Sequence, residues 1–152
     1  MPFADHFQEL TKIIEPLGVT YILTALIGWD REREAHSAGL RTFPIVGMAS
    51  CGYLLALGGN PNSADQSRVL QGLITGIGFV GGGAILKEGA SVRGTATAAS
   101  IWNAGVIGAS VAMGRYEIAT VLALLNLFTL RALLPIKQRI DRTRDERRPS
   151  GD

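Results

Sequence analysis

The 152-residue sequence has little cysteine, and long parts of it have no charge at all. The single cysteine, Cys51, excludes an internal disulfide and has no metal-binding spacing around it. A soluble helical domain of this size would show polar residues every three or four positions. Instead, five stretches of 13 to 23 residues contain no Asp, Glu, Lys or Arg: 16–29, 42–64, 69–86, 94–114 and 118–130. This pattern disfavours a soluble domain.

These uncharged stretches have the length that a membrane requires, because a helix crosses the bilayer core with about 20 mostly apolar residues. They predict an all-α polytopic membrane protein with five transmembrane helices in a single domain over residues 1–136. The predicted spans are about 13–29, 43–58, 69–86, 95–113 and 118–136.

A short amphipathic N-terminal helix is predicted before the first span. Phe3, Phe7, Leu10 and Ile14 recur there at helical spacing among polar residues, as in helices that lie in the membrane interface.

Basic residues are distributed unevenly between the two ends of the spans. Twelve of the fifteen Lys and Arg lie in loop 30–42, in loop 87–94, and from Arg131 into the tail 137–152. The positive-inside rule therefore predicts that the N-terminus is outside, with loops 30–42 and 87–94 and the charged tail in the cytoplasm. A basic block at the end of an apolar sequence indicates a membrane boundary, so no nucleic-acid partner is expected.

The stretch "GIGFVGG" over residues 76–82 fits the G-x-G-x-x-G spacing of a dinucleotide-binding loop. That fingerprint needs a strand before it and an acid about 20 residues later, and neither is visible here. On a helix, the glycines instead form two small faces that permit close packing. This predicts that span three is a central helix held between neighbours, in the same chain or across a dimer. The glycines are Gly72, Gly76, Gly78, Gly81, Gly82 and Gly83. In the alternative, span three breaks and exposes carbonyls or a helix terminus to an ion.

Neutral polar residues recur within span four at helical spacing. Thr97, Ser100 and Asn103 stand at i, i+3 and i+6, and they give the inner half of this span a polar side. Asn103, like Asn126 in span five, should form a hydrogen bond to another helix. The polar side indicates either a hydrogen-bonded helix contact or the lining of a solute path.

Asp30 stands where the first span ends, and the helix dipole disfavours an anion at a helix C-terminus. Arg41 and Arg93 precede spans two and four, where the dipole disfavours a cation. We therefore expect a cytoplasmic cluster of Asp30, Arg41 and Arg93 in which function is concentrated. In the alternative reading, Asp30 is an ordinary solvated loop acid.

No catalytic constellation is visible, since no Ser/His/Asp set, metal-ligand cluster or paired carboxylates can be identified. The protein is therefore not expected to be an enzyme or to need a cofactor. Whether it binds a metal ion is left open.

Several motifs together resemble the membrane domain of the MgtC/SapB family of bacterial inner-membrane proteins. They are "LIGWDRERE", "AGLRTFPIVGMAS", "GIGFVGGGAILKEGASVRGTATAASIW" and "GVIGASVAMG". The resemblance implies a five-span, multi-pass protein of the inner membrane that is linked to magnesium homeostasis, to growth in low magnesium and, in pathogens, to virulence. Longer members add a C-terminal cytosolic domain, and the similarity here is to the membrane domain only.

The family motifs mark a set of candidate functional residues. They are Asp30, Arg31, Arg41, Thr42, Arg93, Thr97, Ser100, Trp102 and, beside them, Asn103. The resemblance implies that the protein modulates other membrane proteins, with the ATP synthase as one candidate partner. The expected surroundings are the lipid bilayer and a homo-oligomer, a dimer being favoured. The alternative function is a small ion or solute channel or transporter with a path along spans three and four.

Overall fold

The computed structural model describes residues 2–33, 38–58, 63–89 and 91–135. Five helices account for most of them: α1 (Pro2–Arg33), α2 (Thr42–Leu55), α3 (Ser63–Gly83), α4 (Thr95–Ala112) and α5 (Tyr116–Ala132). Two short strands, β1 (Leu86–Glu88) and β2 (Ser91–Arg93), join α3 to α4. The prediction of a mostly helical protein is confirmed. The charged tail predicted at 137–152 lies outside the described residues.

Each helix overlaps one predicted span, but the helices differ in their fitness to cross a membrane. Within the described residues, one helical segment, Phe7–Arg33, is long and apolar enough to do so by length and composition. The apolar helix α2 has 14 residues and a length of about 21 Å, whereas the bilayer core is about 30 Å thick. Five crossings and their orientation therefore remain predictions.

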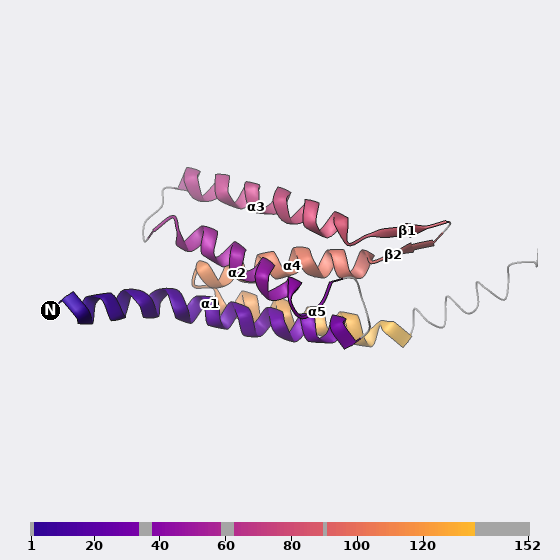
Figure 1. Ribbon diagram of the computed structural model, residues 1–152, viewed down its shortest axis with the longest axis horizontal. Helices are drawn as coiled ribbons and strands as arrows, with labels where there is room; N and C mark the ends of the chain where they lie inside the picture. Colours follow the sequence, from indigo (N-terminus) through magenta and orange to yellow (C-terminus); the bar gives the residue numbers. More distant parts are fainter. Residues whose placement is uncertain (1, 34–37, 59–62, 90, 136–152) are drawn as a thin grey trace, which may run out of the picture.

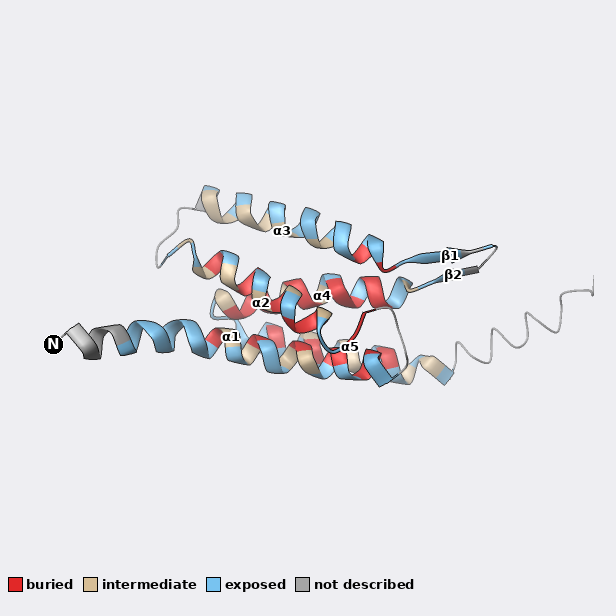
Figure 2. Ribbon diagram, in the orientation of Figure 1, coloured by how far each residue is buried: buried red, intermediate tan, exposed pale blue. Residues whose placement is uncertain are grey.

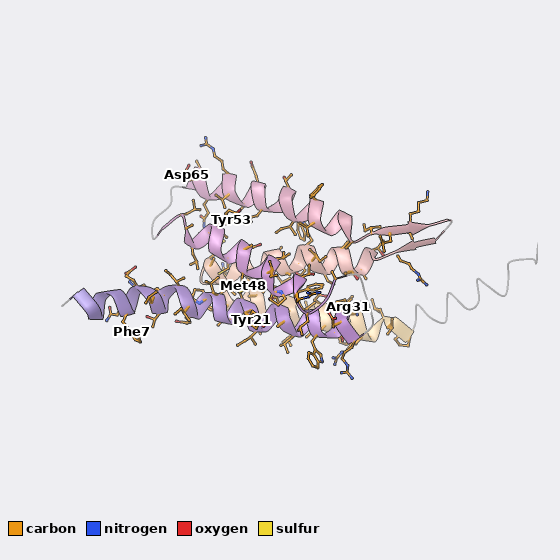
Figure 3. The ribbon with its side chains drawn as sticks, viewed as in Figure 1. Phe7, Tyr21, Arg31, Met48, Tyr53 and Asp65 are labelled. Atoms are coloured by element: carbon orange, nitrogen blue, oxygen red, sulfur yellow. The ribbon has the colours of Figure 1, made fainter. Side chains whose placement is uncertain are left out.

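Helix α1 corrects the prediction of a separate amphipathic helix before the first span. One continuous helix runs from Pro2 to Arg33 and contains the buried Pro16. A proline inside a helix removes a single backbone hydrogen bond, and the helix continues on both sides of it. The first turns of α1 project beyond the other helices (Figure 1), and Phe7 is exposed on this projecting part (Figure 3).

Helix α4 is the centre of the bundle, and it contacts α1, α2, α3 and α5. Most of its surface is buried, whereas α3 is largely exposed (Figure 2). The largest fully buried apolar side chains lie on α4 itself and on α1 and α2 beside it: Ile101, Ile107, Val111, Ile27 and Phe43.

Glycines bring α2 and α4 into backbone contact. A Cβ atom on Gly108 of α4 would overlap the carbonyl oxygen of Gly47 and lie 3.1 Å from the backbone nitrogen of Cys51. On α2, a Cβ on Gly47 would in turn lie 2.7 Å from the Thr24 methyl group of α1. Small residues thus allow α1, α2 and α4 to approach closely, which is how membrane helices gain packing energy without a hydrophobic driving force.

Within this chain, helix α3 is not the central helix that its glycines predicted, and its packing across a dimer stays a prediction. It lies at the edge of the bundle (Figure 1). Of the α3 residues whose burial is described, Gly81 alone is buried. A Cβ on Gly81 would lie 3.1 Å from the carbonyl oxygen of Ala98. A Cβ on any of the other five would meet no atom within 4 Å: Gly72, Gly76, Gly78, Gly82 and Gly83. A helix nearly without side chains on two faces has few groups to insert into its neighbours, so within this chain most of the glycine surface stays open.

The connection between α3 and α4 is a β-hairpin rather than the expected loop. Its strands pair antiparallel with Leu86 opposite Arg93, so helix α3 ends at Gly83, three residues before the predicted end of span three. Gly94 has a φ of 85°, and a Cβ there would overlap the Ala84 carbonyl oxygen. Only glycine fits this turn without strain. The hairpin extends from the end of the bundle at which α1 and α5 also end (Figure 1).

Candidate functional site

The last turns of α1 carry a buried ion pair. Asp30 and Arg31 are adjacent, and their side chains are 7% and 3% exposed. The Nη2 atom of Arg31 donates a hydrogen bond of 2.9 Å to Oδ2 of Asp30. Among the described residues, these are the two charged residues that are buried. The pair lies at the end of α1 opposite to the projecting N-terminal turns, as the position of Arg31 shows (Figure 3).

A second arginine reaches the same carboxylate from the end of α5. The Nε atom of Arg131 donates a 2.7 Å hydrogen bond to Oδ1 of Asp30, across 101 residues of sequence. Both arginines lie in the last turn of their helices, where the helix dipole favours a cation. The two guanidinium groups compensate for an anion at a helix C-terminus. We call Asp30, Arg31 and Arg131 the ionic cluster.

The segment that leads into α2 packs against the same turns of α1. The backbone N–H of Leu40 donates a 3.0 Å hydrogen bond to Oε2 of Glu32. A Cβ on Gly28 would lie 3.0 Å from the Gly39 carbonyl oxygen, so glycine at both positions lets the two backbones approach. The Gly39 carbonyl also accepts from the N–H of Thr42 at 3.1 Å, which begins α2. The ionic cluster and the start of α2 are therefore built on one end of α1.

The partners predicted for Asp30 are wrong. In the described part of the chain, no ion pair joins Asp30 to Arg41 or Arg93, and both arginines are exposed. Arg41 stands at the start of α2 without a capping side-chain bond, and Arg93 ends β2 on the projecting hairpin. Asp30 pairs with arginines in the last turns of two helices, and not with arginines at the starts of helices. The alternative of a solvated loop acid is also wrong, because the carboxylate is buried.

Thr42 begins α2, and the remaining predicted site residues lie on α4, where they are buried to different degrees. Thr97 and Ser100 are buried, Asn103 is half-buried and Trp102 is 45% exposed. The Ser100 hydroxyl donates a 3.0 Å hydrogen bond to Oδ1 of Asn126 on α5. The Asn103 amide donates a 3.3 Å bond to the Leu122 carbonyl. On the polar side of span four, Ser100 and Asn103 thus form hydrogen bonds to α5, whereas the buried Thr97 hydroxyl has no hydrogen-bond partner among the described residues.

This contact leaves a groove of about 320 Å³ between α4 and α5, whose polar lining includes Ser100, Asn103 and Asn126. A larger, apolar groove of about 470 Å³ lies between α2 and α3, with Val46, Tyr53 and Gly76 in its lining. The solute path considered from the sequence ran along spans three and four, but α3 and α4 touch each other at Gly81 and Ala98. Neither of these grooves therefore follows that path.

Metal-binding side chains do not gather anywhere in the described residues, where no three His, Cys, Asp or Glu side chains could hold one ion together. Cys51 is buried and free. Burial and neutral surroundings make it a small core residue.

Comparison with known proteins identifies the scaffold that carries these features. The MgtC family profile matches residues 17–139. The chain belongs to the MgtC family. The match begins before the ionic cluster and includes all of α2, α3, α4 and α5, so the family's shared region contains every residue of the site.

Individual MgtC relatives are similar over most of this chain. Protein MgtC of Salmonella typhimurium is 34% identical over 121 residues, which cover 79% of this chain and 52% of the relative. Protein MgtC of Brucella abortus is 30% identical over 87% of this chain and 56% of the relative. An uncharacterized Synechocystis protein, slr0014, is 30% identical over 85% and 55%. The chain thus spans about half the length of these curated relatives. No solved structure matches it significantly.

Two residues of the site were not predicted from the MgtC motifs, namely Arg131 and Asn126. Arg131 was counted with the basic tail, although apolar residues continue beyond it to Ile136. A charge inside an apolar run needs a partner, and this is the signal that would have found it. Asn126 was expected to bond across helices, but its position beside Ser100 depends on how α4 and α5 pack.

Proposed function

We propose that this chain is a multi-pass protein of the bacterial inner membrane that serves magnesium homeostasis and adaptation to low magnesium. In this proposal it has five spans, an outer N-terminus and an inner C-terminus. It acts by modulating other membrane proteins, such as the ATP synthase, and not as an enzyme, and it needs no cofactor. Membership of the MgtC family supports this proposal, as does the position of twelve of the fifteen basic residues at one end of the spans.

The ionic cluster is the observation that carries the regulatory proposal. The buried charges of the described chain are gathered at one end of the bundle and are paired with each other. Ion carriers place charged or several polar groups along a path through the membrane. A fixed cluster, in which one carboxylate is paired with two arginines, is instead suited to hold helix ends in one geometry. Because Arg131 is 64% exposed, it is also accessible to a partner protein at that end.

A second candidate function is a small ion or solute channel or transporter. The groove between α4 and α5 supports it, since Ser100, Asn103 and Asn126 place neutral hydrogen-bonding groups along one side of two helices. In this candidate, the solute path runs along the groove between α4 and α5 and not along spans three and four.

A growth experiment tests the regulatory proposal. A bacterium that lacks its own MgtC-family gene is given this chain, and its growth is measured in medium with low magnesium. Wild type should restore growth, and Arg131→Gln should not, because it removes a partner of Asp30 and the exposed end of the cluster. Arg115→Gln is the matched control, since Arg115 is exposed near the start of α5 at the other end of the bundle. The protein level of each variant is measured by immunoblot. Full growth with Arg131→Gln at normal protein level would contradict the role of the cluster.

A flux measurement separates the two candidate functions. Purified protein in liposomes should not accelerate the entry of Mg²⁺, followed with an enclosed magnesium-sensitive dye. Faster entry that Asn103→Leu abolishes would favour the channel.

Orientation is tested separately with reporter fusions. A fusion after Ala38 should report cytoplasm, and a fusion after Gly114 should report periplasm. The reverse result would contradict the proposed topology.

A further inference from the structure

The groove between α4 and α5 has hydrogen-bonding groups that the chain itself does not use. Asn126 accepts a bond from Ser100 through Oδ1, and among the described residues no acceptor is recorded for its two amide N–H groups. Asn103 donates through Nδ2 to Leu122, and its carboxamide oxygen has no recorded donor in the same part of the chain. One side of the groove thus has a spare donor, and the other has a spare acceptor.

These groups lie on the outer side of a membrane bundle, where lipid cannot satisfy them. Both asparagines are half-buried, and the rim residues Ala99, Leu125 and Thr129 are exposed. An amide that faces hydrocarbon without a hydrogen-bond partner is costly, so such groups are normally covered by another helix or by water. The groove therefore requires an occupant that offers both an acceptor and a donor.

We infer that the occupant is a second copy of this chain, so that the α4–α5 groove is a two-fold dimer interface. In a two-fold interface the same patch serves both partners, and a contact from one residue to another is made twice. A patch with one spare donor and one spare acceptor is complementary to itself. Each copy can donate from Asn126 and accept at Asn103, which satisfies both groups in both copies.

The shape of the groove rim agrees with this occupant. On the α4 side the rim residues are Ala96 and Ala99, which are small and exposed and let another helix approach closely. On the α5 side, Leu125 is 56% exposed and can enter the groove of the other copy. The inference differs from the dimer suggested by the sequence, which used the glycines of α3. It does not rest on the proposed regulatory function, because a regulator and a channel could both be dimers.

Cysteine cross-linking in native membranes tests the interface. The variants are Leu125→Cys at the groove rim and Phe79→Cys on α3, which is 86% exposed. Cys51 is fully buried, so wild type is the control without an accessible thiol. Mild oxidation should give a disulfide-linked dimer for Leu125→Cys and monomer for the other two. A dimer from Phe79→Cys alone would assign the interface to α3, and monomer from both variants would exclude a dimer at the groove. Either result would overturn the inference.

A charged maleimide, applied to the same membranes, distinguishes a dimer from a water-filled path. A thiol reacts with this reagent only where water reaches it, so Leu125→Cys should label slowly. Rapid labelling without cross-linking would show an aqueous groove and would also overturn the inference.

A second experiment tests the hydrogen bonds by measuring dimer dissociation in detergent. Asn126→Leu should weaken the dimer roughly five- to tenfold, since two symmetric interhelical bonds are lost. Ser100→Ala is the matched control, because it removes the bond to Asn126 within the chain and leaves the spare N–H groups. It should keep the dissociation constant within about twofold. Equal weakening by both variants would show that Asn126 acts through the fold of one chain, and the proposed bond would be wrong.

Discussion

Helices α3 and α4 are both rich in small residues, yet they occupy opposite positions in the molecule. Eleven of the eighteen residues of α4 are buried, and α4 contacts all four other helices. In α3 the buried position is Gly81, and five other glycines face open space. The difference lies in the neighbours. Gly105 of α4 receives the Ile77 side chain of α3, and Gly108 receives the backbone of α2. A small residue permits close packing, but a neighbouring group must occupy the space it leaves.

The largest loss of stability is expected at the ionic cluster, because the buried charges of Asp30 and Arg31 each depend on the other as a neighbour. Asp30→Asn removes the negative charge beside the buried Arg31 and should cost about 3–5 kcal/mol of stability. Arg131→Gln should cost at most about 1 kcal/mol, because its side chain is largely exposed to solvent. Thermal unfolding of both variants in detergent micelles measures the difference. Equal melting temperatures for the two variants would show that Arg31 does not need the Asp30 charge as a buried partner.

The glycine that α4 places against α2 should show the next largest effect. Gly108→Ala adds a Cβ that overlaps backbone atoms of Gly47, which cannot turn away as a side chain could. We expect a loss of about 1–3 kcal/mol, the usual cost of overpacking. The measurement is the same thermal unfolding, together with the elution volume of the purified protein. An unchanged melting temperature would mean that Gly108 and Gly47 are not in backbone contact.

Gly81 tests whether α3 contains one position that behaves like α4. Gly81→Ala places a Cβ 3.1 Å from the Ala98 carbonyl, a tight contact that a small shift of α3 can relieve. Its cost should be about 1 kcal/mol relative to Gly76→Ala, which serves as the matched control on the same helix. A stability equal to that of Gly76→Ala would contradict this prediction, since it would show that α3 is not held against α4 at Gly81.

The smallest effect, with the opposite sign, is expected on the open face of α3. Gly76→Ala meets no atom within 4 Å, and alanine is favoured over glycine inside a helix by about 1 kcal/mol. The melting temperature should stay the same or rise slightly. A clear fall in melting that depends on protein concentration would assign this face to an interface with another copy, as the sequence suggested.

Sequence alone determined the broad features of the chain. The charge-free runs predicted that there are five helices and which part of the chain each occupies, because apolar composition and helical length follow directly from the order of residues. The motifs identified the MgtC family, which the comparison confirmed over residues 17–139. The pairing of Asp30 with a cation was expected, since an anion at a helix C-terminus needs a compensating charge; its burial was not.

Tertiary structure decided which groups meet. Arg131 lies 101 residues from Asp30. Its place in an apolar run signals that it needs a partner, but no local pattern says that this partner is Asp30. The glycine pattern of α3 and the alanine and glycine pattern of α4 both permit close packing, and helix periodicity cannot say which one is surrounded. That choice depends on the side chains of other helices, such as Ile77 over Gly105 and Asn126 beside Ser100. Sequence specifies the faces of each helix, but only the fold brings two faces together.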